Sequence, residues 1–197
     1  MSQHMTRDAI ALSGRAFEHA IRVGSPFLGA EHFLFALAAA DQPAGAVLRE
    51  HGVTSERVAT EITRVGLLGD LDRDALATIG IDVDAVYAKA AGSFGPKALT
   101  LASRAAHREP RLRRLDPRRV PGAGRGGAFL PHDPGGRQGF GNAIEEAELR
   151  HAPQIDVEHL ALGFLRVTEG AVPAILSGLG VSGPAVRAAI LDRYPWL

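Results

Sequence analysis

The sequence of 197 residues contains no cysteine and only two lysines, and these absences exclude several classes of protein. Without cysteine there is no disulfide, no thiolate nucleophile and no zinc site built on sulfur. Neither Lys89 nor Lys97 follows a glycine, so the phosphate-binding loop that ends in Gly-Lys-Ser/Thr is missing. Residues 180–183, Gly-Val-Ser-Gly, fall short of the nucleophile motif G-x-S-x-G, and H-E-x-x-H is absent. We therefore expect no catalytic residue, no cofactor and no metal.

The charges balance, and no apolar run is long. Lysine and arginine total 22, aspartate and glutamate also total 22, so the chain as a whole does not attract nucleic acid or an acidic membrane. Hydrophobic residues make up 46%, enough for a packed core. No run approaches the roughly 20 residues that span a membrane. The first ten residues, MSQHMTRDAI, lack the apolar core of a signal peptide. These features predict a cytoplasmic protein without a membrane partner.

An internal repeat is the most informative feature of the chain. Residues 28–37 read LGAEHFLFAL and residues 155–164 read IDVEHLALGF, so that a Glu-His pair, Glu31-His32, recurs 127 residues later as Glu158-His159. Further apolar and glycine positions match downstream at nearly the same offset. A series of matches in one order over about 60 residues indicates two related halves.

The first half is typical of short helices. Residues 6–22 carry apolar side chains at three- and four-residue spacing, which predicts an amphipathic helix, and residues 30–40 predict a second. A short third helix should end near Gly52 in a left-handed conformation, and Thr54 should cap a fourth. Few runs alternate with period two. The predicted fold is all-α, with two pseudo-symmetric repeats of about four helices each.

The second half offers matching caps at Asp156 and Ser182, and two unlike segments separate the halves. Residues 68–95 predict one or two short helices on the first half. Residues 108–141 are rich in Arg, Pro and Gly, a composition typical of flexible linkers. The predicted division of the chain is a first repeat at 5–66, an additional helical segment at 67–107, a flexible basic linker at 108–131 and a second, diverged repeat at 132–197, with both repeats in one domain.

The paired Gly-x-Glu-His and Asp-x-Glu-His motifs, each followed by apolar residues, resemble the Clp repeat, which builds the N-terminal domain of ClpA/ClpC-type AAA+ unfoldases. The resemblance covers residues 5–64 and 132–194, about 120 residues. The ATPase rings of that family are missing from this sequence, so it looks like a stand-alone relative. The resemblance implies a non-enzymatic platform for Clp substrates, degrons or adaptors, or for the unfoldase itself.

The resemblance to ClpC-type proteins implies a domain that binds phosphoarginine, and it implies specific residues for this role in the present sequence. Each pocket would combine the glutamate of a Glu-His motif with a threonine at a helix start. The first pocket would be Thr6 with Glu31, and the second Asp133 with Glu158, where the negative charge of Asp133 would repel a phosphoryl group. The helix after Asp133 carries four glycines, which predicts that it starts late or forms only against a partner.

The same family domain also binds cyclic-peptide antibiotics through an aromatic residue before each first helix. The positions implied here are Met5 and His132, with Phe129 nearby as a substitute. Because these are mostly not aromatic, the sequence supports the sequestering of peptide-like compounds only as an alternative function.

Simpler interpretations remain for each feature. Glu31 and Glu158 would also stabilise a helix N-terminus, and the two motif histidines are typical of buried structural residues. Residues 104–125 hold eight arginines against two acids, which would suit a regulator that binds nucleic acid through this linker. No aromatic residues interleave with these arginines, however, and that argues against nucleic acid as the partner. The eight histidines are scattered, which argues against metal.

Overall fold

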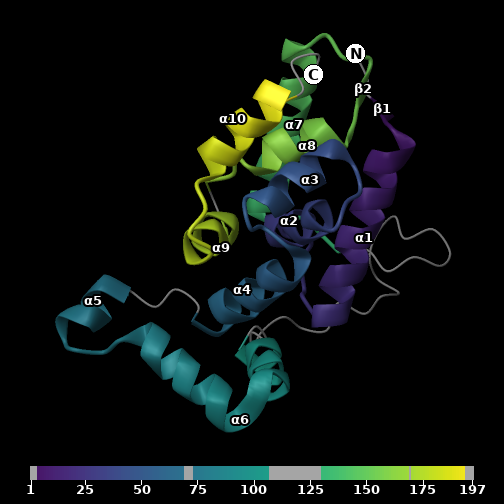
Figure 1. Cartoon of the computed structure of the whole chain (residues 1–197). Coiled ribbons are helices and arrows are strands. Elements are labelled where there is room, and N and C mark those ends of the chain that lie inside the picture. The colour runs from purple at the N-terminus through teal and green to yellow at the C-terminus, as the bar shows by residue number, and fades with distance from the viewer. Residues whose placement is uncertain (1–3, 69–72, 107–129, 169, 194–197) are drawn as a thin grey trace, which may run out of the picture.

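The computed structural model describes residues 4–68, 73–106, 130–168 and 170–193. Over these residues it contains ten helices and one pair of short strands (Figure 1), which confirms the all-α fold. The helices are α1 (Arg7–Val23), α2 (Ala30–Ala38), α3 (Pro43–Glu50), α4 (Ser55–Leu68), α5 (Arg73–Thr78), α6 (Val83–Ala106), α7 (Pro134–Leu149), α8 (Val157–Phe164), α9 (Val172–Gly178) and α10 (Gly183–Arg193), and the strands are β1 (His4–Met5) and β2 (Gln154–Ile155).

The helices of the first half begin and end at the residues predicted to cap them. The hydroxyl of Thr6 accepts a hydrogen bond from the backbone N–H of Ala9 at 3.2 Å and so caps α1. Gly52 follows α3 with a φ of 79°, the left-handed conformation that glycine adopts without strain. The hydroxyl of Thr54 accepts from the N–H of Arg57 at 3.4 Å where α4 starts.

The second half repeats this arrangement in α7–α10. Asp156 caps α8 by accepting from the N–H of His159 at 3.0 Å, and Ser182 accepts from the N–H of Ala185 at 3.4 Å at the start of α10. Four helices on each side, with caps at matching positions, agree with the two predicted pseudo-symmetric repeats.

The two halves exchange the segments that precede their helices. β1 lies parallel to β2, and the N–H of Thr6 donates to the carbonyl of Ile155 at 2.9 Å just beyond the pair. On the other side, Leu28 forms an isolated parallel bridge with His132, and its N–H donates to the carbonyl of Pro131 at 2.9 Å. The segment before the first helix of each half therefore runs beside the segment before the second helix of the other half.

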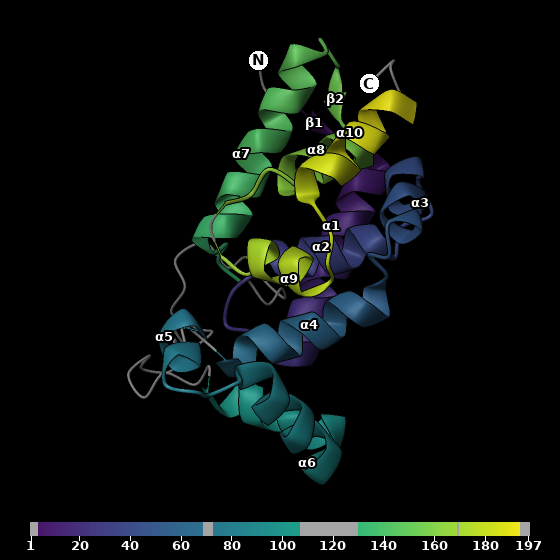
Figure 2. The ribbon, with the colours of Figure 1, turned by 60° about the vertical axis from the view of Figure 1, so that its left-hand side comes forward.

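One hydrophobic core serves both halves. The ring of Phe33 in α2 stacks on the ring of Phe164 in α8, with centroids 4.5 Å apart, and Phe140 of α7 meets both rings edge-on. The buried apolar residues of α1–α4 and α7–α10 belong to a single cluster. Figure 2 shows α2 and α8 inside the shell formed by the other helices of the two halves.

The start of α7 contradicts the expectation drawn from its glycines. The helix begins at Pro134 and runs through all four of them. Gly139 lies so close to the ring of Phe164 that a Cβ would overlap it, and Gly136 lies against the carbonyl of Leu28. These glycines let α7 approach α8 and the first half closely. The surface that supports the helix therefore belongs to the same chain.

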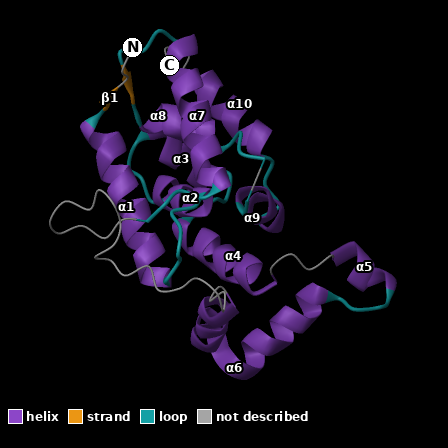
Figure 3. Cartoon of the chain, turned by 180° about the vertical axis from the view of Figure 1, so that it is seen from behind, coloured by secondary structure: helices purple, strands orange, loops and turns teal. Residues whose placement is uncertain are grey.

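The segment between the halves is more helical than expected. In place of one or two short helices over 68–95, the structure has α5 and the 24-residue α6, which breaks at Gly95 with a φ of 76°. Arg64 of α4 holds Asp84 at 3.0 Å, which fixes the start of α6. In Figures 1 and 3, α5 and the bend in α6 lie away from the other helices. The predicted flexible linker, 108–131, lies outside the described residues except for its last two.

Candidate functional site

Glu31 lies in the first turn of α2, where its carboxylate folds back over Gly29. Its side chain is 16% exposed, and its Oε1 atom lies 3.3 Å from Nε2 of His32. Burial raises the pKa of Glu31 to about 7; a hydrogen bond from its own N–H opposes the shift, and the charge of Asp133 adds to it. A carboxyl group with a pKa near 7 is about half protonated at neutral pH. A bound cation would take the place of that proton and stabilise the ionised carboxylate.

Glu158 takes the matching position in α8. Burial raises its pKa and the charge of Asp156 adds to this, while hydrogen bonds from its own N–H and from the N–H of Ala44 oppose the shift. Its Oε1 atom is buried and has no hydrogen-bond partner among the described residues. A buried carboxylate oxygen without a partner is costly, so this atom marks a place where a donor from a ligand would be stabilised.

The structure brings the four predicted residues together in a different combination. Thr6 bonds to the backbone just before Glu158, whereas the charge of Asp133 acts on Glu31. Each candidate site thus combines a glutamate of one half with the helix cap of the other half. These contacts favour a pairing between halves, Glu31 with Asp133 and Glu158 with Thr6, over the expected pairing within each half, because the segments before the helices are exchanged. That these residues bind a ligand stays a prediction.

The two capping side chains already hold their own helices. Thr6 accepts from the N–H of Ala9, and Oδ1 of Asp133 accepts from the N–H of Gly136 at 2.6 Å. The site that includes Thr6 therefore contains a hydroxyl, and the site that includes Asp133 contains a carboxylate. The site of Glu31 and Asp133 holds two acidic groups and suits a cation. At the site of Glu158 and Thr6 the capping residue is neutral, and the neighbouring acid, Asp156, is already held by His159.

The residues predicted for hydrophobic docking lie mostly inward. Met5 is half-buried and packs on the core from β1. His132 is also half-buried; its ring lies over Phe33 with centroids 6.2 Å apart and meets Phe140 edge-on at 5.1 Å. Phe129 lies outside the described residues. Docking of an apolar ligand at these positions stays a prediction.

Beneath the Glu31 site lies a buried pair of histidines that the sequence reasoning missed in part. Nδ1 of His19 lies 3.1 Å from Nδ1 of His32, and the His19 ring stacks on Phe35 at 3.8 Å. Burial lowers the pKa of His19 to about 4, with the charge of Arg22 adding to it, and burial lowers the pKa of His32 to about 3. Both rings are thus neutral, and one donates to the other. The sequence does contain a signal for this burial, because His19 lies three residues after Ala16 and so shares the buried face of α1.

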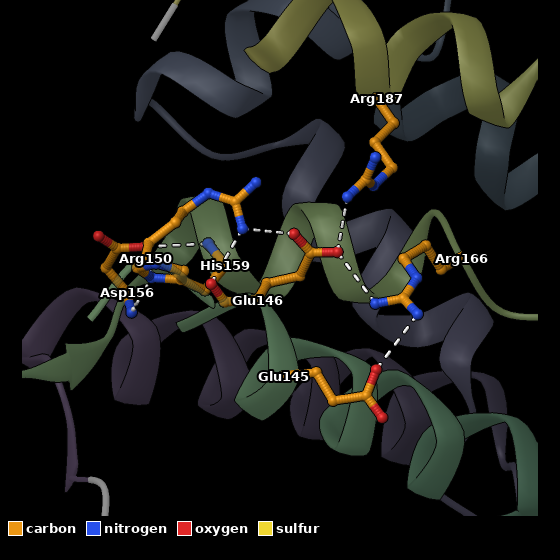
Figure 4. A network of polar contacts seen from close by, with 7 residues as sticks. All are labelled: Glu145, Glu146, Arg150, Asp156, His159, Arg166 and Arg187. Atoms are coloured by element: carbon orange, nitrogen blue, oxygen red, sulfur yellow. Dashed lines mark hydrogen bonds and ion pairs between the residues drawn. The ribbon is translucent and has the colours of Figure 1, made fainter. Parts of the chain in front are cut away.

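A buried glutamate in α7 forms a second polar feature that the sequence did not predict (Figure 4). Glu146 is fully buried; its Oε1 accepts from Arg166 at 3.0 Å and from Arg187 at 2.7 Å, and its Oε2 accepts from Arg150 at 2.6 Å. Arg166 also pairs with Glu145 at 3.2 Å. Burial alone would raise the pKa of Glu146, but the hydrogen bonds and charges of Arg187 and Arg150 outweigh it and lower the pKa.

The described residues contain no group of three or more His, Asp or Glu side chains that could hold a metal ion. Among the described helices, none is long and apolar enough to cross a membrane alone; α9 and α10 reach the required length and hydropathy only as a pair bent by 90°.

Comparison with known proteins decides the fold. No protein-family model matches the sequence, and no curated protein matches it. Solved structures do match it. The N-terminal domain of the caseinolytic-protease-associated chaperone ClpD from Arabidopsis thaliana is 18% identical with a TM-score of 0.58, and the match covers 99% of this chain and 97% of that one. The Hsp104 N-terminal domain from Candida albicans is 12% identical with a TM-score of 0.58, covering 99% and 94%. This chain has the Clp N-terminal domain fold.

The Clp N-terminal domain fold confirms the resemblance drawn from the two Glu-His motifs. At these identities the likeness establishes the fold alone. In this Clp N-terminal domain fold, the motifs occupy the first turns of α2 and α8, at matching places in the two halves.

Proposed function

We propose that the chain is a non-enzymatic docking module that binds arginine-bearing segments of proteins in Clp-dependent proteolysis. The observation that carries this proposal is the pair of half-buried glutamates, Glu31 and Glu158, each at the same place in its half of a Clp N-terminal domain fold. The natural partners in this proposal are Clp substrates, degrons or adaptors, or the unfoldase itself. Binding of peptide-like compounds and a cytoplasmic location remain predictions from the sequence.

Arginine fits the chemistry of both sites. A guanidinium group donates two parallel hydrogen bonds to a carboxylate, and its fixed charge compensates a buried acid. The site of Glu158 and Thr6 adds the hydroxyl of Thr6 at the start of α1, where the positive end of the helix dipole would favour a phosphoryl group beside the guanidinium. The site of Glu31 and Asp133 adds a second carboxylate, which would repel phosphate and favour unmodified arginine. We therefore propose that the two sites differ in specificity.

The test uses two capped peptides that differ only in whether one arginine is phosphorylated. By isothermal titration calorimetry, Glu158→Gln should weaken the phosphoarginine peptide about tenfold and Glu31→Gln the unmodified one about tenfold, the loss of a charge-assisted pair. Glu18→Gln, an exposed glutamate of α1, is the matched control and should change neither. Equal binding of both peptides to all four proteins, or no binding at all, would refute the proposal.

The cellular role follows from a second assay. Affinity capture from a lysate of the source organism, followed by mass spectrometry, should recover Clp substrates or the unfoldase with the wild-type protein and lose them with the double variant Glu31→Gln/Glu158→Gln. In a reconstituted degradation reaction, an accessory factor would speed the loss of a client and a decoy would slow it. No change in degradation, with no Clp protein captured, would leave the fold without this function.

A further inference from the structure

On the second half, away from the two glutamate sites, the surface is hollowed into a groove of about 1250 Å³. Its walls are formed by the end of α7 and by residues 165–168, which follow α8. The opposite walls are α9 with the turn after it, and α10 as far as Leu191. Most of the lining is apolar, and the largest apolar contributors are Leu149, Leu165, Val167, Leu176, Val181 and Leu191. Leu149 is 72% exposed, although it is a leucine at the edge of a hydrophobic groove. An exposed leucine there is stabilised once a partner covers it.

The charged residues of the groove leave an excess of positive charge. Glu146, Arg166 and Arg187 are the charged side chains in the lining, so two guanidinium groups face one carboxylate. Glu146 engages one nitrogen of each arginine, which fixes their positions without using all their donors. Nε of Arg187 is buried and has no hydrogen-bond partner among the described residues. Arg166 also pairs with Glu145 through its other terminal nitrogen, so Arg187 is the arginine that keeps unused donors beside the apolar hollow.

We propose that this groove binds an acidic, apolar segment of a partner protein. Leucine-like side chains would fill the hollow, and a neighbouring aspartate or glutamate would accept from Arg187. The pre-formed network with Glu146 lowers the entropy cost of this recognition, because the arginine side chains are already ordered. The groove shares no residue with the sites of Glu31 and Glu158, so the proposal goes beyond the function given above and stands independently of it.

The charge of the groove favours an acidic peptide over the other negatively charged partners. An excess of one positive charge is too small for the multiple phosphate contacts that nucleic acid binding uses, and the lining offers no aromatic ring on which a base could stack. A single carboxylate that pairs with the oriented guanidinium of Arg187, next to apolar side chains, matches what the residues provide.

The test compares two capped hexapeptides on the full chain by fluorescence anisotropy. One peptide has a glutamate flanked by a leucine on each side. Its twin is identical except that a lysine replaces the glutamate. We expect the glutamate peptide to bind at least about tenfold more tightly, with the difference shrinking as salt increases. Ala188, exposed on α10 in the groove wall, supplies the key variants. Ala188→Glu should abolish the preference for the glutamate peptide, and Ala188→Lys should keep it.

A second pair of variants tests the apolar part without touching the network. Leu149→Ser removes an exposed leucine of the groove and should weaken the glutamate peptide about tenfold. Ile10→Ser removes an equally apolar residue that is 58% exposed on α1, outside the groove, and should leave binding unchanged. Equal affinity for both peptides, binding that survives Leu149→Ser and Ala188→Glu, or no binding of either peptide would overturn the proposal. Arginine-peptide binding at Glu31 and Glu158 is measured separately, so the two proposals can fail independently.

Discussion

Glu31 allows a direct test of the electrostatics of its site through stability. Burial raises its pKa from 4.5 to about 7 in the folded chain, whereas in the unfolded chain it titrates near 4.5. Between pH 4.5 and pH 7, Glu31 therefore keeps its proton in the folded state but loses it in the unfolded state. The free energy of unfolding falls as pH rises through this range, and above pH 7 the ionised carboxylate destabilises the fold. A shift of 2.5 pKa units corresponds to about 3 kcal/mol at 1.36 kcal/mol per unit.

Replacing the carboxyl with an amide removes this cost and its pH dependence. Relative to wild type, the stability gained by Glu31→Gln should grow by about 2.5 kcal/mol from pH 5 to pH 8, with most of the growth below pH 7 and a plateau above it. The assay is urea unfolding of both proteins at half-unit pH steps, in which contributions common to both cancel. Glu18→Gln, an exposed control, should give a difference that is flat with pH. A flat or falling difference for Glu31→Gln would show that the carboxyl is not desolvated, and the reasoning about its site would be wrong.

Three further outcomes follow from other contacts. Because burial lowers the pKa values of His19 and His32, their neutral pairing stabilises the fold above pH 6.5 and is lost as pH falls, by about 2 kcal/mol per histidine at pH 5; Asn at either position should flatten the acid limb of a urea stability profile. Gly139→Ala should lower stability by about 1–3 kcal/mol, since its Cβ meets a buried ring, while Gly141→Ala, with open space around it, should raise stability by up to about 1 kcal/mol in thermal unfolding. Glu146→Ala leaves three arginines without their carboxylate and should cost about 3–5 kcal/mol in the same assay.

Local sequence signals predicted the helices well, because each depends on neighbours in the chain. The hydroxyl of Thr6, the glycine at position 52 and the carboxylate of Asp156 act on backbone groups within a few residues, and the structure has each of them in the predicted role. The internal repeat likewise follows from the sequence, since the two Glu-His motifs lie at matching places in the two halves.

Long-range features escaped prediction for the opposite reason. The exchange of segments depends on Thr6 reaching Ile155 and Leu28 reaching Pro131, contacts between residues more than 100 positions apart that leave no local pattern. The start of α7 differs from the prediction because the close packing that Gly136 and Gly139 allow offsets the entropy cost of glycine in a helix. Glu146 and Arg150 lie four residues apart, a spacing that suits an ion pair at a helix end, but nothing near them in the sequence signals the burial of Glu146 or its contact with Arg187.

The exchange of segments between the halves also bears on the connection that joins them. Each candidate site takes its glutamate from one half and its capping residue from the other, so neither half alone contains a complete site. Phe33 and Phe164 stack across the same boundary, so a separated half would also expose its core. The entropy cost of a connection grows only with the logarithm of its length, about 0.6 kcal/mol for each doubling. A long, polar connection between the halves is therefore compatible with one shared core and two composite sites.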